Sequence, residues 1–313
     1  MPGTSRLLGG AAMLGAAALA WGGMFAVAKP LMQEIDPFTL TLIRYAPTSL
    51  IFLGLLWAVE GRGALATEGR ALHLWAIGTL GFAGFGLFAF LGLRSTRPEH
   101  GAVIPALMPL IAVGVAALRA RAWPAPRQLG AVGVGLLGVA LVVTHGDPRS
   151  LLTGGAGGGE ALILVGATTW VLYTLGAAAF PGWSGLRYTA LTAAFGALSI
   201  AGITLTALAV GAATLPSPAV LVAAAPEFAY LVLAASVVAV LGWNAGMRAL
   251  GPARGVLFIN LVPVTAFAIA VAGGRVPAGA EIAGVALVIA ALILNSLAPA
   301  ARTVAAPVLP VRG

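Results

Sequence analysis

The chain has 313 residues, of which 60% are hydrophobic and 8% are charged, and its formal net charge is +8. Because a soluble domain carries about 25% charged residues, the composition excludes an ordinary soluble protein, and the lack of cysteine excludes disulfides and thiolate chemistry. The arginines lie in short segments between apolar runs, so the positive charge indicates membrane topology and not nucleic-acid binding.

Ten apolar runs have about the length that a helix needs to cross a bilayer, which is roughly 20 residues. In chain order they cover residues 7–28, 38–59, 72–93, 101–118, 128–144, 160–180, 187–211, 227–247, 255–272 and 281–298. The run after Arg6 resembles a signal peptide, but it continues to Ala28 and has a counterpart in the second half of the chain. The sequence therefore predicts an all-α integral membrane protein with ten transmembrane helices.

The basic residues of the loops predict the orientation of these helices. Eleven arginines lie at the termini and in the even-numbered loops: Arg6, Arg62, Arg70, Arg119, Arg121, Arg127, Arg187, Arg248, Arg254, Arg302 and Arg312. Five basic residues lie in the odd-numbered loops: Lys29, Arg94, Arg97, Arg149 and Arg275. We therefore expect both termini to be cytoplasmic.

The chain contains an internal repeat, because residues 92–130 and 246–284 align without a gap at an offset of 154. The matched pairs are Gly92/Gly246, Arg94/Arg248, Pro98/Pro252, Gly101/Gly255, Leu107/Leu261, Pro109/Pro263, Ala112/Ala266, Ala116/Ala270, Arg121/Arg275 and Gly130/Gly284. Five helices are an odd number, so the two halves must insert with opposite topology. We expect a first five-helix repeat (1–144), a glycine-rich connector (145–159), a second five-helix repeat (160–300) and a cytoplasmic tail (301–313).

Weaker matches between the two halves occur in the same order along the chain. Ala18 and Trp21 recur as Ala167 and Trp170, and Arg44-Tyr45 recurs as Arg187-Tyr188. Together with the segment Trp21-Gly-Gly-Met-Phe-Ala-Val-Ala-Lys29, Arg44 and the Pro109 and Pro263 segments, they carry a resemblance. The chain resembles the ten-helix, two-repeat exporters (EamA-type) of the drug/metabolite transporter superfamily over roughly residues 10–298.

The resemblance implies a bacterial inner-membrane transporter, and the aromatic-rich helices are most similar to the aromatic amino-acid exporters. The chain departs from the family in one respect. Related proteins often place a glutamate in the turns after helices 4 and 9, where this chain has Arg121 and Arg275. A role for those turns is therefore not carried over.

Two basic residues near the expected outer end have alternative interpretations. Arg44 lies about two turns into helix 2, where a cation costs roughly 2–3 kcal/mol unless it is paired or hydrated. It either extends to the interface or faces a central cavity and attracts a substrate carboxylate. Lys29 is expected to anchor helix 1 at the interface, and a role in a gate or with substrate is the alternative.

Polar and aromatic residues inside the spans are candidates for a binding site. Helix 8 places Ser236, Val240, Trp243, Asn244 and Met247 on one face. Asn244 needs a partner, which is either a neighbouring helix or a solute. The predicted substrate-binding residues are Trp21, Arg44, Tyr45, Phe82, Phe85, Trp170, Tyr173, Trp243, Asn244 and Met247. For Phe82 and Phe85, packing against neighbouring helices is an equally simple interpretation.

Prolines interrupt helices 4 and 9 at Pro105, Pro109 and Pro263, so we expect kinks there that act as hinges. Proline is also tolerated in membrane helices for packing reasons alone. All nine carboxylates fall at span ends or in loops, and proton-coupled transport commonly relies on a carboxylate inside the membrane. Uniport or solute exchange is therefore at least as well supported as proton antiport. The three histidines, His73, His100 and His145, lie far apart in sequence and predict no metal site.

The sequence thus predicts a transporter and not an enzyme, because it lacks a clustered nucleophile, acid pair or metal set. We expect export of aromatic or other neutral amino acids, or similar small metabolites, by alternating access, with the lipid bilayer as surroundings. We expect a monomer, no cofactor and no nucleic-acid partner. Export of drugs or nucleotide sugars is the alternative within transport, and an integral membrane enzyme or a scaffold is the alternative outside it.

Overall fold

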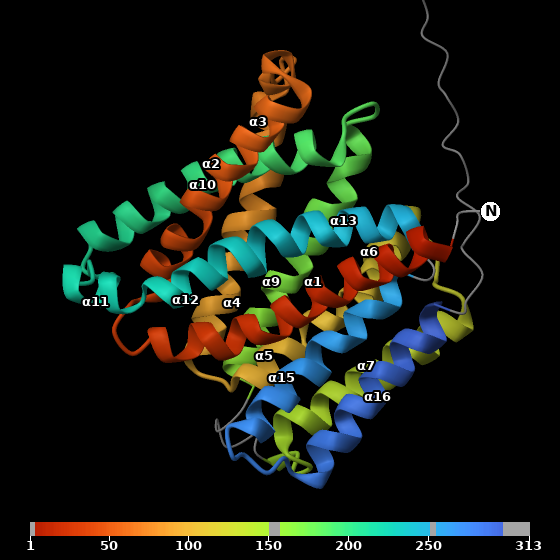
Figure 1. Ribbon diagram of the computed structural model, residues 1–313. Helices are drawn as coiled ribbons and strands as arrows, with labels where there is room; N and C mark the ends of the chain where they lie inside the picture. Colours follow the sequence, from red (N-terminus) through yellow and green to blue (C-terminus); the bar gives the residue numbers. More distant parts are fainter. Residues whose placement is uncertain (1–3, 150–156, 251–254, 297–313) are drawn as a thin grey trace, which may run out of the picture.

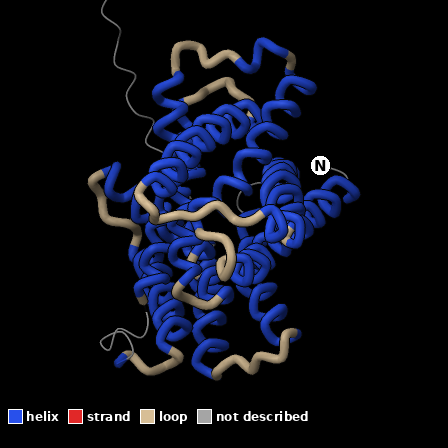
Figure 2. Tube along the Cα trace, turned by 90° about the vertical axis from the view of Figure 1, so that its left-hand side faces the viewer, coloured by secondary structure: helices blue, strands red, loops and turns tan. Residues whose placement is uncertain are grey.

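The computed structural model describes residues 4–149, 157–250 and 255–296, and these residues form helices and connecting loops (Figures 1 and 2). Within this part of the chain, 8 helices are long and apolar enough to cross a membrane. Two shorter apolar helices, Phe258–Ala272 and Gly279–Leu294, complete the ten expected. The prediction of an all-α integral membrane fold is confirmed.

The membrane helices, in chain order, are α1 (Thr4–Leu31), α2 (Pro37–Glu60), α3 with α4 (Ala71–Gly78, Phe85–Arg94), α5 with α6 (Pro98–Val103, Met108–Ala120), α7 (Pro126–Thr144), α9 (Gly158–Gly176), α10 (Gly185–Ala209), α12 with α13 (Ala225–Ala229, Ala239–Leu250), α15 (Leu261–Ala272) and α16 (Gly279–Ser296). A short helix, α11 (Pro218–Ala223), lies between α10 and α12. The observed ends lie within a few residues of the predicted apolar runs.

Local chemistry explains where helices begin and end. The carboxylate of Asp36 accepts hydrogen bonds from the backbone amides of Phe38 and Thr39, at 2.9 and 3.0 Å, and so caps the start of α2. Pro37 occupies the first turn, where its missing N–H is no loss. At the other end Gly61 has φ of 81°, a value that favours glycine, and the helix stops.

Four helices change their hydrogen-bonding pattern along their length. A π-helical segment (Thr79–Gly84) joins α3 to α4, and another (Tyr230–Val238) joins α12 to α13. A 3-10 turn (Pro105–Leu107) joins α5 to α6, and another (Val256–Asn260) precedes α15. The two π segments, and likewise the two 3-10 turns, are separated in sequence by nearly the 154-residue offset of the repeat. The π segments were not predicted, because no residue type specifies them.

The helix pairs with the most extensive contacts join the two halves of the chain: α7 with α16, α1 with α13, α4 with α9, and α2 with α10. Figure 1 shows α16 running along α7. Glycines permit close approach at equivalent places. A Cβ at Gly138 would lie 2.6 Å from the carbonyl oxygen of Gly284, and the reverse distance is 2.5 Å. Likewise Gly92 packs against the backbone of Gly159, and Gly246 packs against that of Gly10.

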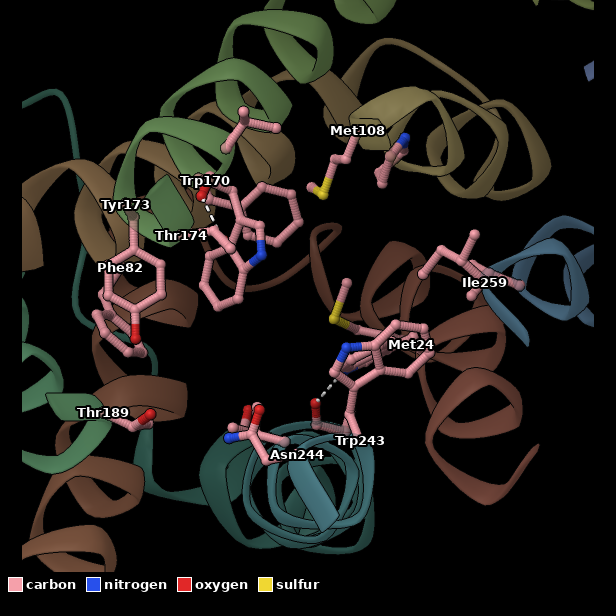
Figure 3. Close-up of a pocket in the computed structure, with 18 of the residues that line it drawn as sticks. Met24, Phe82, Met108, Trp170, Tyr173, Thr174, Thr189, Trp243, Asn244 and Ile259 are labelled. Carbon is pink, nitrogen blue, oxygen red and sulfur yellow. Dashed lines mark hydrogen bonds between the residues drawn. The ribbon is translucent and has the colours of Figure 1, made fainter. Parts of the chain in front are cut away.

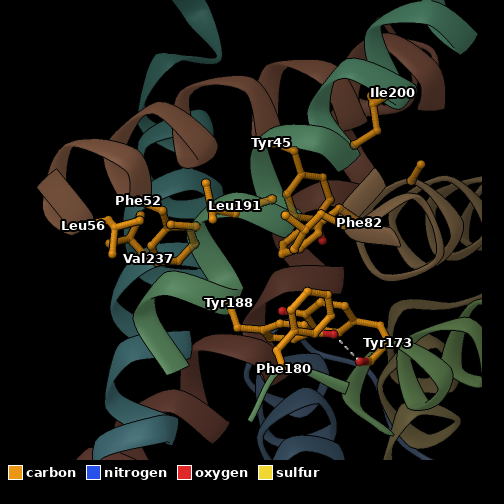
Figure 4. Close-up of a cluster of buried hydrophobic side chains, with 14 of the residues drawn as sticks. Tyr45, Phe52, Leu56, Phe82, Tyr173, Phe180, Tyr188, Leu191, Ile200 and Val237 are labelled. Carbon is orange, nitrogen blue, oxygen red and sulfur yellow. Dashed lines mark hydrogen bonds between the residues drawn. The ribbon is translucent and has the colours of Figure 1, made fainter. Parts of the chain in front are cut away.

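Large apolar side chains are exposed along the middle of the helices, as a lipid-facing surface requires. Leu50, Leu198 and Leu205 have exposed fractions of 68%, 65% and 64%. The interior of one part of the bundle is an aromatic cluster that includes Tyr45, Phe82, Tyr173 and Tyr188 (Figure 4). The outward-facing leucines therefore belong in the bilayer, while the aromatic residues are turned inward.

The expected domain boundaries stay predictions. Residues 150–156 of the predicted connector (145–159) and the whole predicted tail (301–313) lie outside the described residues.

Candidate functional site

A cavity of about 490 Å³ lies between the two halves of the bundle. Its walls come from α1, α2, the first π segment with α4, α6 and the 3-10 turn before it, α9, α10, the second π segment with α13, and α15 and the 3-10 turn before it. The fold brings all ten predicted site residues to this cavity: Trp21, Arg44, Tyr45, Phe82, Phe85, Trp170, Tyr173, Trp243, Asn244 and Met247. Their role in binding substrate stays a prediction, but their convergence on one space is a property of the structure.

Arg44 is the one charged residue among the described residues that line the cavity. Its side chain is buried, with 4% of the residue exposed, and its Nε donates a hydrogen bond of 2.9 Å to Ser236 Oγ. The guanidinium carbon lies 4.7 Å from the ring centre of Tyr45 and 5.7 Å from that of Phe90. In the described part of the chain no carboxylate forms an ion pair with it. Arg44 therefore does not extend to the interface, and it presents an unneutralised cation to the cavity.

Aromatic rings form one wall of the cavity (Figure 3). Phe82, in the π segment after α3, lies 5.5 Å from Tyr45, 5.9 Å from Trp170 and 5.3 Å from Tyr173, measured between ring centres. Phe85 lies 5.5 Å from Trp170. These distances fall in the range of favourable edge-to-face contacts, so the wall is a coupled set of rings.

The opposite wall contains Trp21 of α1 and Trp243 of α13, whose ring centres lie 5.2 Å apart. Trp21 Nε1 donates to the backbone oxygen of Ala235 at 3.0 Å, within the second π segment. The neighbouring Asn244 points its amide into the cavity (Figure 3), and no hydrogen bond from its side chain to a described residue is found. A solute as the partner of Asn244 stays a prediction.

Of the lining residues that were not predicted, two make specific contacts with predicted ones. Ser236 holds Arg44, and the helix 8 face on which it lies was recognisable from its spacing. Tyr188 stacks on Tyr173 at 5.2 Å and donates to its backbone oxygen at 2.6 Å. The pairing of Arg44-Tyr45 with Arg187-Tyr188 in the repeat was the signal that could have identified it.

The cavity reaches one end of the bundle and stops short of the other. Its lining continues to Ala177, Gly185 and Met247, where α9 ends, α10 begins and α13 approaches its end. Near this open end Arg187 pairs with Glu68 at 2.8 Å. Hydrogen bonds from Trp183 and Arg187 hold the pKa of Glu68 below its usual range.

The opposite, closed end is sealed by buried groups. Lys29 donates to the backbone oxygens of Leu93, Arg94 and Thr96, at 2.7, 3.0 and 2.8 Å. These carbonyls lie at the end of α4 and in the turn that follows it, where backbone oxygens are open to further donors. Lys29 thus fastens α1 to the end of α4, in addition to any contact with the membrane interface.

Two of the three histidines lie together in the fold, so the expectation that all three are far apart was wrong. At the closed end, the rings of His100 and His145 lie 5.4 Å apart. His100 Nδ1 lies 2.9 Å from Glu160 Oε1, and its Nε2 lies 3.4 Å from Glu281 Oε1. His73 alone stays apart, against Phe180 of the open end. The fold joins residues that are 181 positions apart in the chain, which no local pattern reveals.

Arginines complete this charged cluster. Arg275, in the loop before α16, places one terminal nitrogen 3.0 Å from Glu99 Oε1 and the other 2.5 Å from Glu281 Oε1. Glu99 and Glu281 are buried, so these contacts neutralise carboxylates inside the bundle. Burial lowers the pKa of His145, which lies just beyond α7.

The predicted hinge residues lie at the helix interruptions. Pro105 begins the 3-10 turn before α6, and Pro109 occupies the first turn of α6. Pro263 lies in the first turn of α15, directly after the other 3-10 turn. Pro105 and Pro109 also line the cavity. Their action as hinges stays a prediction.

Comparisons with known proteins agree with this architecture. The profile of the EamA-like transporter family matches residues 8–144. "Uncharacterized transporter YrdR" of Bacillus subtilis is 31% identical over 285 residues, which is 90% of this chain and 89% of the relative. "Uncharacterized transporter YyaM" of the same organism is 28% identical over 276 residues, or 88% of this chain and 89% of the relative. A crystal structure with 22% identity matches with a TM-score of 0.61 and covers 94% of this chain and 98% of its own, which shows a shared fold.

Proposed function

The chain belongs to the EamA-like transporter family, within the drug/metabolite transporter superfamily, and we propose that it exports small amphipathic solutes that carry an anionic group. Aromatic and other neutral amino acids are the first candidates. Family membership confirms the predicted superfamily and the prediction of a multi-pass membrane transporter and not an enzyme. The finer match to aromatic amino-acid exporters, the bacterial inner membrane, the cytoplasmic termini and the monomeric state stay predictions.

The unpaired guanidinium of Arg44 carries the proposal. A buried cation without a counter-ion is costly, and a fold keeps such a group where a ligand completes it. A carboxylate entering the cavity would accept hydrogen bonds from the guanidinium, which gives geometric selectivity as well as binding energy. Ser236 orients the group through Nε, so the remaining N–H groups are left for the solute.

The aromatic walls support an apolar or aromatic side chain on the same solute. They also weigh against the alternatives. A cationic drug would meet the cavity's positive charge, and the described lining residues include no carboxylate to receive it. A nucleotide sugar carries two or more phosphate charges, whereas the described lining offers one cation.

The arrangement of the helices supports alternating access. The main helix pairs join the two halves in a reciprocal pattern, and the cavity lies between them with one closed end. Interruptions at Pro105 and before Pro263 divide equivalent helices near the cavity. We propose that the halves rock about these places, so that the solute reaches first one face of the membrane and then the other.

One observation favours a second candidate substrate. The cavity has no described carboxylate to receive an ammonium group, so an aromatic or aliphatic carboxylate without an amino group would satisfy Arg44 equally well. The ring faces of Trp21 and Trp243 can receive an ammonium weakly, by a cation–π contact. The two candidates therefore differ in one functional group.

The proposal is tested by uptake into proteoliposomes that contain the purified protein. The panel comprises neutral amino acids, their decarboxylated amines and their deaminated acids, each with and without an imposed pH gradient. We expect uptake of compounds that carry a carboxylate and an apolar side chain. Uptake of the amines alone, or of none of the carboxylates, would contradict the proposed function.

A further inference from the structure

The charged cluster at the closed end has the geometry of a metal site. His100 Nε2, His145 Nδ1 and Glu281 Oε1 all lie within 4.8 Å of one another. The two nitrogens are 3.4 and 3.3 Å from the carboxylate oxygen. Those distances exceed the roughly 2.7–2.9 Å of a charge-assisted hydrogen bond. They match the edge of about 3.3–3.4 Å that separates ligand atoms around a tetrahedral zinc ion with bonds of 2.0–2.1 Å.

The surroundings of His100 add a second, independent observation. Its other nitrogen, Nδ1, lies 2.9 Å from Glu160 Oε1, and Glu160 is in turn held by Thr96 Oγ1. A carboxylate that accepts the N–H of a histidine leaves the lone pair of the opposite nitrogen free, and it raises the basicity of that nitrogen. Most metal-ligating histidines have such a partner. Here the free nitrogen is Nε2, the one that faces Glu281 and His145.

Arg275 occupies part of the space that a metal would need, but the structure offers it another partner. One of its terminal nitrogens already bonds Glu99 Oε1. The second carboxylate oxygen of Glu99 is buried and has no hydrogen-bond partner. A small rotation of Arg275 would let both of its terminal nitrogens bond Glu99 and would free Glu281 Oε1.

The charges of the cluster are compatible with a divalent cation. Glu99, Glu160 and Glu281 contribute three negative charges, and Arg275 with Arg97 contributes two positive charges. Arg97 is 3.9 Å from Glu281, and its side chain is 54% exposed, so solvent screens it. An ion can enter past His145, whose side chain is 38% exposed.

We propose that His100, His145 and Glu281 bind a divalent transition-metal ion, zinc before others, and that the ion fastens the closed end. Two imidazoles and one carboxylate suit zinc and leave a fourth position for water. The histidines belong to the first half of the chain and Glu281 belongs to the second, so the ion joins α5, the end of α7 and α16. Binding stabilises the conformation in which this end is closed, and zinc therefore slows transport.

The binding test uses the purified full-length protein in detergent, stripped of metal and titrated with zinc or with magnesium. We expect one zinc ion per chain and a rise in melting temperature, with no response to magnesium. His145→Ala should abolish both effects, and Glu160→Gln should weaken zinc binding about 10- to 100-fold. His73→Ala, which alters the histidine at the other end, is the matched control and should behave like the unmodified protein.

Absence of stoichiometric zinc binding would overturn the proposal, as would binding that His145→Ala leaves unchanged. The fastening role has its own test, because zinc should slow uptake of any transported solute in the unmodified protein and in His73→Ala but not in His145→Ala. Zinc that binds without slowing uptake would overturn that role. Since binding is measured without a solute, these outcomes do not depend on the proposed substrate.

Discussion

The cavity and the charged cluster at the closed end differ in whether their buried charges are neutralised by other residues of the protein. In the cavity, Arg44 is buried, and its contacts with other described residues are to one hydroxyl and two ring faces. In the cluster, Glu99 and Glu281 are buried too, but both contact Arg275, and His100 faces a carboxylate on each side. Both regions lie inside a bundle whose buried residues are mostly apolar.

The difference separates structure from function. Charges that neutralise one another within the protein hold helices together. Removal of one member destabilises the fold, because the other charge is left buried without a partner. A charge that the protein leaves unneutralised contributes nothing of that kind to the fold. Its counter-charge must come from elsewhere, and we propose that for Arg44 it comes from a solute.

The largest expected effect sets the two regions directly against each other. Arg275→Met leaves the buried carboxylates of Glu99 and Glu281 without their cation and should destabilise the protein by about 3 kcal/mol. Arg44→Met breaks no ion pair among the described residues, and it should leave the melting temperature unchanged or raise it. Thermal denaturation of both variants in the same detergent measures the contrast. Equal destabilisation would erase the distinction between the regions.

A smaller effect is expected where the cavity wall is altered but the charge is kept. Trp243→Ala removes the ring that lies against Trp21, so transport should fall about tenfold while expression stays intact. Trp123→Ala is the control, since Trp123 is 89% exposed. Unchanged transport by Trp243→Ala would remove this residue from the site.

Tyr188→Phe tests how firmly the aromatic wall is held. The hydroxyl donates to the backbone oxygen of Tyr173 at 2.6 Å, so its loss should cost about 1 kcal/mol of stability. Tyr45→Phe is a matched change on the same wall, because no hydrogen bond from the Tyr45 hydroxyl is found in the described part of the chain. Melting temperatures that fall equally for both variants would show that the hydroxyl bond of Tyr188 does not hold the wall.

The smallest effect concerns the exposed pair at the open end. Because hydrogen bonds from Trp183 and Arg187 lower the folded-state pKa of Glu68, its charge stabilises the fold above the unfolded pKa. That contribution is lost as pH falls through the lowered pKa. Glu68→Gln should therefore melt slightly below the unmodified protein at neutral pH, and the two should converge in acid. A difference in melting temperature that grows as pH falls would contradict the lowered pKa of Glu68.

The sequence was sufficient for much of the fold and for one of the two regions. Apolar runs mark the spans because the bilayer sets their length. The cavity residues could be predicted because they are polar or aromatic groups on periodic helix faces, as with Trp243 and Asn244. The repeat of Arg44-Tyr45 also pointed to Tyr188, although that residue was not selected.

The charged cluster could not be predicted, for a physical reason. Its members lie at helix ends, where charged residues are common and usually contact water. Only the packing of α5, α9 and α16 brings His100, Glu160 and Glu281 together and buries them. The π segments that contain Phe82 and Ser236 were missed for a similar reason, because they depend on tertiary packing and not on residue type.

The proposed function depends most on the claim that Arg44 pairs with the anionic group of the solute. The most direct test compares thermal stabilisation of the purified protein by phenylalanine, 3-phenylpropionate and phenethylamine, which differ only in their charged groups. We predict stabilisation by the two carboxylates and not by the amine, complete loss of that stabilisation in Arg44→Gln, and partial retention in Arg44→Lys. Equal stabilisation by phenethylamine, or stabilisation by the carboxylates that persists in Arg44→Gln, would contradict the claim.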